Sequence, residues 1–355
     1  GEAGAGLQLS PLLETGKSLL LGITLEPMRS LGSYLTGIRH PEGFHGQGIT
    51  KNFFEGWYFK FVSADQTQRW AVIPGIFRGL VGESRDEAFV QVLDGSTGRS
   101  WYHRFEVSDF SASPNRFDVK VGGNHFHERG AELDLPQLKG HLEITTALKP
   151  WPVTLSSPGI MGWYGLVPFM ECFHGIVSFG HDLKGLLEVE GSTVSFDGGK
   201  GYIEKDWGKN FPSGYIWLHS NHVESDPEAS LVASAAIIPW LRRPFRGFIM
   251  GLHHLGTLHR WTTYNGSQEE LLSLDDSHVT WRVSGPDGVL ELRAERKRGG
   301  LLHAPLREAM HQRVEETMDG RIEIRHTKGS KVLLDSVATC GAMEVFGDTE
   351  RLLRI

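Results

Sequence analysis

The sequence predicts an all-β protein of antiparallel strands with few short helices. From Phe53 onward, short extended runs rich in aromatic and β-branched residues alternate with turn residues, which is the spacing of an all-β protein. Turn sequences such as Asp94-Gly95 and Gly122-Gly123-Asn124 favour tight connections between neighbouring strands. Helical periodicity is confined to residues 306–317. These patterns allow either barrels or sandwiches.

The expected strands are distributed along the whole body of the chain. In the first half they are residues 53–62, 70–77, 88–93, 100–107, 117–121, 142–147, 176–179 and 186–189. In the second half they are residues 231–238, 253–264, 279–283, 290–294, 321–326 and 331–338. Residues 1–39 carry apolar positions interrupted by proline and glycine, and we expect an extension of short helical turns there.

The length of the chain predicts two domains. A chain of 355 residues and 39.5 kDa is long for one domain. We place a boundary near Gly191, which gives a first β domain at residues 40–190 and a second at residues 191–355. Each is large enough to bury an apolar core of its own.

Composition excludes several classes of protein. The net charge of -7 argues against a nucleic-acid partner, which needs a basic face. The apolar runs are shorter than the roughly 18 residues that a membrane-spanning helix requires. Cys172 and Cys340 are too few for a disulfide framework, so a reducing, cytoplasmic compartment fits best. Because the sequence begins with Gly1 rather than Met, a targeting segment upstream is left open.

Residues 201–221 concentrate polar and aromatic side chains. A glycine-rich turn at 196–201 leads into one extended run, and a second turn at 210–214 leads into another, so we expect a hairpin. Side chains alternate across a strand, which places every second residue on one face. The residues expected on a common wall are Tyr202, Glu204 and Asp206 from the first run, and Tyr215, Trp217, His219 and Asn221 from the second.

The same stretch carries a specific motif. The sequence at 202–212 is Tyr-x-Glu-Lys-Asp-Trp-Gly-x-x-Phe-Pro, and it is followed by Trp217 and an Asn. This pattern resembles the signature of the tocopherol cyclase family. The segment Phe-Phe-Glu-Gly-Trp-Tyr-Phe-Lys at 53–60 resembles a second hallmark, so the resemblance spans roughly residues 40–350. Plant members of the family have Asn, Trp and Gln at the positions of Asp206, Tyr215 and His219, which leaves the substrate open.

The resemblance implies two lipocalin-like barrel domains with the site at or between their openings. It also implies a cofactor-independent reaction that closes a chromanol ring by adding a phenolic hydroxyl across an isoprenoid double bond. That reaction needs a proton donor for the alkene, rings beside the developing cation, a group that holds the phenol and a dry pocket. The catalytic candidates are Glu55, Glu204, Asp206, His219 and Asn221, and the substrate-binding candidates are Trp57, Phe59, Tyr202, Trp207, Tyr215 and Trp217.

Each acid has a structural alternative. Glu55 shares a strand face with Trp57 and Phe59, which fits a proton donor with a pKa raised by burial, but also a carboxylate at the rim of a barrel. Glu204 and Asp206 are a paired-acid candidate, since like charges on one face raise one of the two pKa values. Ion pairs with the neighbouring lysines satisfy the same sequence.

The rings and histidines also have alternatives. Tyr215 and Trp217 fit the wall of a cation-stabilising pocket and His219 fits a group that holds the phenol, but all three also fit an ordinary core. His125 and His127 share a strand face, a spacing that some metal sites use. Spacing anchors no third ligand for them, so we predict no metal.

We therefore predict a cofactor-independent cyclase whose partner is a hydrophobic small molecule, such as a prenylated hydroquinone. Two other classes remain open: a non-catalytic isoprenoid or lipid carrier, and an alkene hydratase or pericyclase on the same scaffold. The apolar run at 231–240, followed by arginines at 242, 243 and 246, fits either a peripheral contact with an anionic membrane or a core strand that ends in a solvated turn. The oligomeric state is not predicted.

Overall fold

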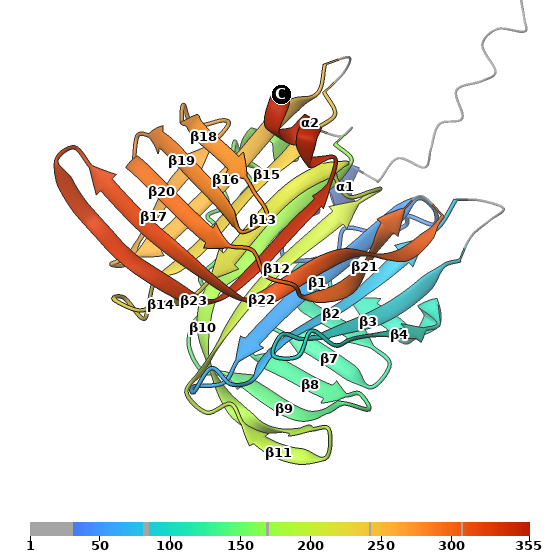
Figure 1. Cartoon of the computed structure of the whole chain (residues 1–355). Helices are drawn as coiled ribbons and strands as arrows, with labels where there is room; N and C mark the ends of the chain where they lie inside the picture. Colours follow the sequence, from blue (N-terminus) through green and yellow to red (C-terminus); the bar gives the residue numbers. More distant parts are fainter. Residues whose placement is uncertain (1–30, 81–84, 168–169, 241–242, 307) are drawn as a thin grey trace, which may run out of the picture.

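The computed structural model describes residues 31–80, 85–167, 170–240, 243–306 and 308–355, and these are almost entirely β (Figure 1). All strand pairs among them are antiparallel, which confirms the predicted fold class. The helices are α1 (Leu31–Arg39), α2 (Thr349–Arg354) and two short 3-10 turns at Val107–Asp109 and Gly162–Leu166. Most of the predicted N-terminal extension, residues 1–30, lies outside the described residues. No described helix has both the length and the apolar character needed to cross a bilayer.

The first sheet contains the strands of the N-terminal half in the order β4-β3-β2-β1-β12-β10-β9-β8-β7-β6-β5, with β11 beside β10. Their bounds are β1 (Phe53–Val62), β2 (Arg69–Arg78), β3 (Glu87–Asp94), β4 (Ser100–Phe105), β5 (Phe110–Ala112), β6 (Asp118–Val121), β7 (Asn124–His127), β8 (Gly130–Asp134), β9 (Leu138–Ile144), β10 (Cys172–Val189), β11 (Ser192–Ser195) and β12 (Gly199–Gly208).

The second sheet has the order β17-β16-β15-β13-β23-β22-β20-β19-β18, with β14 beside β23 and β21 beside β22. Its bounds are β13 (Gly214–Ser220), β14 (His222–Val223), β15 (Ser230–Ile238), β16 (Phe245–His254), β17 (Thr257–Thr262), β18 (Gln268–Leu274), β19 (His278–Gly285), β20 (Gly288–Glu295), β21 (Gly300–Leu306), β22 (Ala309–Lys328) and β23 (Lys331–Gly347).

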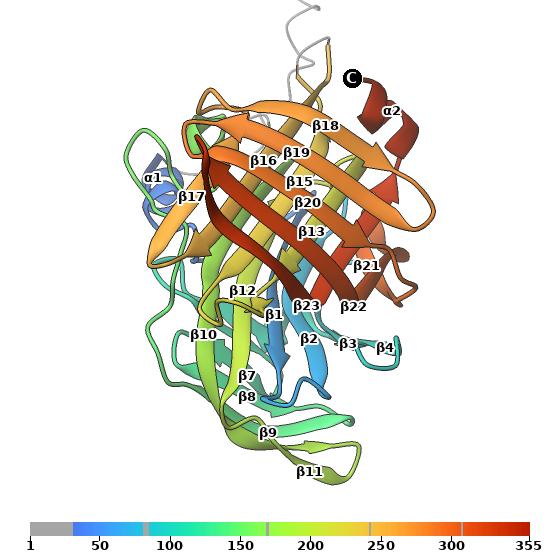
Figure 2. The ribbon, with the colours of Figure 1, turned by 60° about the vertical axis from the view of Figure 1, so that its left-hand side comes forward.

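Each sheet curls around an apolar core of its own. In the first, β6 comes close to β2 and β3, and in the second, β17 comes close to β19. A third apolar cluster lies where the two sheets meet, and we call this region the seam; its members include Tyr58, Tyr202, Trp217, Val232 and Ala342. Figure 2 shows the two sheets stacked one above the other. Strands at the seam are therefore buried on both faces, one toward their own core and one toward the other sheet.

The predicted hairpin at 201–221 is wrong. β12 pairs with β1 and β10 in the first sheet, whereas β13 pairs with β15 and β23 in the second. The turn between them carries the chain from one sheet to the other. Gly208 ends β12 with a φ of 146°, and a Cβ there would lie 2.2 Å from the carbonyl oxygen of Glu171, so this crossing requires glycine. The two strands still face the same region, but from opposite sides of the seam.

The helix predicted at 306–317 is also wrong, because most of these residues belong to β22. Met310 pairs with Pro305 and Val314 with Leu302, and a register shift between them inserts one extra residue. Met310 and Val314 are both buried and stand four positions apart, a spacing that also lies along one face of a helix.

The hairpin of β21 and β22 ties the sheets together. β21 extends over the first sheet, where it lies close to β3 and β4 (Figure 1). The Gln91 amide donates to the carbonyl of His303 at 2.9 Å, and its oxygen accepts from the His303 N–H at 2.7 Å. After Gly191, β11 and β12 pair within the first sheet. The division into two domains near that residue stays a prediction.

Candidate active site at the seam

The candidate site is a cavity of about 180 Å³ in the seam, lined by residues of both sheets. Because side chains alternate along β1 and β12, the even-numbered residues of both strands face the seam. Tyr58 and Glu204 are register partners there and both line the cavity. From the second sheet, β13 contributes Tyr215 and Trp217 to the opposite wall.

Most of the cavity wall is apolar. Phe54 and Phe89 come from the first sheet, and Phe248, Ile249 and Leu302 come from the second. An apolar cleft with a few converging polar groups is the usual form of a small-molecule site. This wall suits a hydrophobic ligand and keeps water away from the polar groups described next.

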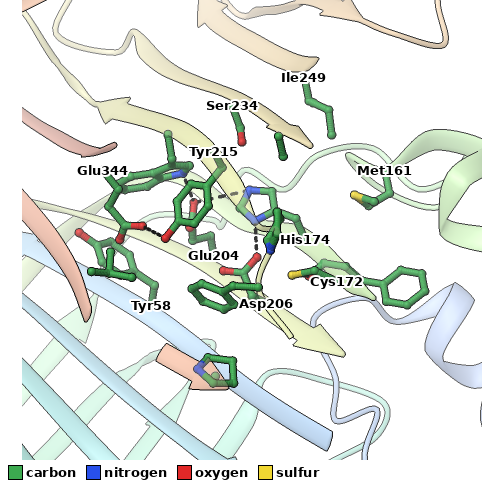
Figure 3. A pocket seen from close by; sticks show the side chains of 18 of the residues that line it. Tyr58, Met161, Cys172, His174, Glu204, Asp206, Tyr215, Ser234, Ile249 and Glu344 are labelled. Carbon is green, nitrogen blue, oxygen red and sulfur yellow. Dashed lines mark hydrogen bonds and ion pairs between the residues drawn. The ribbon is translucent and has the colours of Figure 1, made fainter. Parts of the chain in front are cut away.

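His174, Glu204 and Asp206 form the polar centre of the cavity (Figure 3). The Nδ1 atom of His174 lies 2.8 Å from an Asp206 oxygen, and its Nε2 atom lies 3.7 Å from Glu204 Oε2. Burial alone would lower the pKa of His174, but the charges of Glu204 and Asp206 outweigh it and raise the pKa to about 9. When Glu204 is neutral, Asp206 is the charged partner that favours the protonated form of His174, through the contact with Nδ1.

Glu204 is suited to hold a proton. Burial, assisted by the charge of Asp206, raises its pKa to about 8 despite the opposing charge of His174. The Tyr202 hydroxyl and the Trp217 indole both donate to Oε2, the latter at 3.1 Å. Because both donors use the same oxygen, Oε1 is the atom available to carry a proton toward a ligand.

Two further carboxyl groups lie beside this centre, each paired with a tyrosine. Tyr215 donates to Glu344 at 2.6 Å, and Tyr58 donates to Glu316. Burial raises the pKa of Glu344 to about 7, and burial together with the charge of Glu344 raises the pKa of Glu316 well above its usual range. The seam thus concentrates carboxyl groups that favour their neutral form.

His219 and Asn221 lie in the seam but do not line the cavity. The His219 ring stacks on Tyr202 with ring centroids 3.5 Å apart, so it forms a layer behind that residue. Burial, and then the charge of Lys60, whose Nζ lies 3.4 Å from the His219 Nδ1, hold the pKa of His219 well below its usual range. Asn221 donates to the carbonyl of Gly201 at 3.0 Å and thereby joins the two sheets. Neither geometry supports direct contact with a ligand in the cavity.

Glu55, Trp57, Phe59 and Trp207 occupy the other face of β1 and β12, outside the cavity. Glu55 forms a fully buried ion pair with Lys205, whose ammonium group sits 4.6 Å from the Trp57 ring centroid and 4.8 Å from that of Trp207. Burial raises the pKa of Glu55, but the charge of Lys205 together with the hydrogen bond and charge of His45 holds it below its usual range. An ionised carboxylate in an ion pair is a poor proton donor, and Phe59 is a core residue.

Sequence reasoning missed His174, Glu316 and Glu344 as site residues. A weak signal existed for Glu344, which is an acid inside the apolar run 342–346 and therefore a candidate for burial. Glu316 was hidden within the residues predicted to be helical. His174 follows Cys172 and Phe173 in a short extended segment that carries no motif.

Two other predicted features lie away from the cavity. The Nε2–H of His125 donates to a carboxylate oxygen of Asp118 at 2.9 Å on the first sheet. The run at 231–238 is β15, a largely buried strand, and Arg246 pairs with Glu269 at 2.5 Å rather than lying free.

Solved structures with related architecture support the fold. Kievitone hydratase from Nectria haematococca superimposes with a TM-score of 0.50 at 13% identity, over 92% of this chain and 95% of its own. CghA with Sch210972 superimposes with a TM-score of 0.52 at 9% identity, over 83% of this chain and 88% of its own. At such low identity these likenesses establish the fold alone.

Sequence relatives are found among chloroplastic enzymes. The probable tocopherol cyclase of Oryza sativa subsp. japonica is 22% identical over 372 residues, covering 86% of this chain and 77% of its own. The tocopherol cyclase of Zea mays is 22% identical over 370 residues, with the same coverage. The tocopherol cyclase-like family model matches residues 145–347, more than half of the chain. The chain therefore belongs to the tocopherol cyclase-like family.

Proposed function

We propose that the protein catalyses acid-initiated ring closure of a prenylated hydroquinone or a related isoprenoid-bearing phenol, with no cofactor and no change of oxidation state. The observation that carries this proposal is the buried Glu204 carboxyl, whose pKa is raised to about 8 in an apolar cavity. A carboxyl of this kind is neutral at physiological pH and can act as a general acid. Membership of the tocopherol cyclase-like family supports the same reaction class.

In the first step, Glu204 transfers its proton from Oε1 to the less substituted carbon of the alkene. The other alkene carbon becomes a tertiary cation. The rings of Trp217 and Tyr215 line the cavity beside Glu204, and a desolvated ring next to a cation contributes about 2 kcal/mol or more. The newly formed Glu204 carboxylate adds electrostatic stabilisation within the apolar wall.

In the second step, the phenolic oxygen attacks the cation and closes the ring. The phenolic proton passes to Asp206, which the His174 imidazolium holds in position at 2.8 Å. Transfer of this proton from Asp206 to the Glu204 carboxylate, directly or through solvent after the product leaves, regenerates the starting acid. The product is an isomer of the substrate, and no atom is gained or lost.

The test is a product assay with the purified chain in deuterated buffer. We expect a prenylated hydroquinone to yield a chromanol with one deuterium on the former alkene carbon. A product heavier by one water molecule would instead identify a hydratase. Saturable binding without any product would identify a carrier, and either result would overturn the cyclase proposal.

A further inference from the structure

Three histidines cluster away from the candidate active site, inside the core of the second sheet. His254 ends β16 and His259 lies on β17, where the register makes them diagonal neighbours on one face. His326 lies on β22 and reaches them across the curled sheet: its Nδ1 atom is 3.1 Å from the His254 Nε2, and its ring centroid is 4.6 Å from that of His259. None of the three lines the cavity in the seam.

The cluster is largely buried, with His259 half-buried, and it is incompletely hydrogen-bonded. His254 is 1% exposed and His326 is fully buried. Within the described part of the chain, the buried Nδ1 atoms of His254 and His259 have no hydrogen-bond partner. A buried polar atom without a partner costs about 1–3 kcal/mol, so such atoms call for an explanation.

His326 has the orientation of a metal ligand. Its Nε2 lies 2.7 Å from the carbonyl oxygen of Asp287, so the Nε2–H donates there and the Nδ1 lone pair points into the cluster. Metal-binding histidines are usually oriented by a hydrogen bond of this kind from the other ring nitrogen.

One ring nitrogen from each histidine lies within 4.8 Å of the other two. A tetrahedral zinc ion with Zn–N bonds of about 2.0–2.1 Å needs ligand atoms roughly 3.4 Å apart, which small side-chain rotations supply. Three neutral imidazoles are a ligand set that zinc accepts. The charged groups nearest the cluster, Asp226, Asp287 and Lys328, are of mixed sign.

We propose that His254, His259 and His326 bind one Zn²⁺ ion, which fastens the hairpin of β16 and β17 to β22 across the core of the second sheet. Two other groups of side chains have ligand spacing, but each already has charged partners. His174, Glu204 and Asp206 form the charge network of the candidate active site. In the group of His125, His127 and Glu132, His125 is bound to Asp118. Among the three groups with ligand spacing in the described residues, the histidine cluster is the one made of three imidazoles with no carboxylate ligand of its own.

The test is zinc titration of the full chain, purified without a histidine tag and treated with a chelator. Isothermal titration calorimetry should show one equivalent of Zn²⁺ bound to the wild type. His254→Gln and His259→Gln should lose this step. His253→Gln, next to the cluster in sequence, and His127→Gln, on the first sheet, should retain it.

A second measurement guards against variants that fail to fold. Circular dichroism should show the same β content in every variant, and Zn²⁺ should raise the melting temperature of the wild type and both controls but not of the cluster variants. Absence of zinc binding by the wild type would overturn the proposal. So would binding that survives both cluster substitutions, or that disappears with His127→Gln.

Discussion

The indole N–H of Trp217 donates to Oε2 of Glu204 at 3.1 Å across the seam. Trp217 belongs to the second sheet and Glu204 to the first, so both sheets hold the proposed proton donor. The apolar surroundings that raise the pKa of Glu204 likewise come from both sheets. The chemistry of this carboxyl therefore depends on how the sheets dock.

Replacement of the proposed acid should slow turnover. Glu204→Gln keeps the size of the side chain but cannot donate a carboxylic proton, so we expect the rate of ring closure to fall by about 10²–10⁴-fold. Glu188→Gln, an exposed change on β10 of the same sheet, is the matched control and should change nothing. Steady-state kinetics with melting curves on both variants would decide. A full rate in Glu204→Gln would reject the acid assignment.

The pH dependence of the rate should follow the protonated form of Glu204. With a pKa raised to about 8, the rate should be level at neutral pH and fall above that value. The Tyr202 hydroxyl stabilises the carboxylate and so lowers this pKa. Tyr202→Phe should accordingly move the alkaline limb of the kcat profile to higher pH. A limb that stays in place, or moves down, would contradict the assignment.

The contribution of Glu204 to stability should fall as the pH rises above the acidic range. The pKa of Glu204 is raised from 4.5 to about 8 in the folded state, so its protonation favours folding fully below about pH 4.5, and this contribution is lost as the pH rises through about 8. Glu344, with a pKa raised to about 7, acts in the same direction. Urea unfolding at about pH 5 and about pH 8 should therefore show a smaller difference in Glu204→Gln than in the wild type. An equal difference would argue against a raised pKa.

Glu55 should matter for stability rather than for chemistry. Removing one partner of a buried ion pair costs about 3–5 kcal/mol, because the other charge stays buried. Glu55→Gln should thus lower the free energy of unfolding by an amount of that order, while the turnover of the folded fraction stays close to wild type. Chemical denaturation with activity corrected for folded protein measures both. A large loss of turnover at full stability would restore Glu55 as a catalytic candidate.

Ligand binding should be visible in tryptophan fluorescence. Trp217 lines the cavity, whereas Trp281 is buried in the core of the second sheet. A prenylated hydroquinone should quench the emission of the wild type in a saturable way. Trp217→Phe should remove most of that quenching and Trp281→Phe little of it. The reverse pattern would place the ligand elsewhere.

Strand alternation in the sequence grouped several of the residues that line the cavity. It assigned Glu204 and Asp206 to one face and Tyr215 and Trp217 to another, and all four line the cavity. Alternation could not tell which face of β1 lines the cavity. Nine of the ten residues of that strand are buried, so neither face is recognisable as the one exposed to solvent. Glu55 was therefore expected to line the cavity, whereas it lies on the other face of β1 in an ion pair with Lys205.

The remaining site residues depend on contacts that local patterns do not contain. Glu344 becomes unusual only beside Tyr215, 129 positions away, and Glu316 only beside Tyr58, 258 positions away. Neither acid differs in local sequence from a carboxylate on a solvated strand. The spacing of residues within the sequence does not show which strands meet at the seam.

The same separation along the chain bears on the order of folding. Tyr58 and Glu316 stand near opposite ends of the sequence, so the contact between them must form after nearly all of the chain has been synthesised. The first sheet can complete its own ladder earlier, since β1 to β12 need no strand from the second. Until the second sheet docks, Glu204 stays hydrated and ionised and has no proton to donate at neutral pH. Under the proposed mechanism, a nascent or partly folded chain is thus kept from generating a carbocation in contact with water.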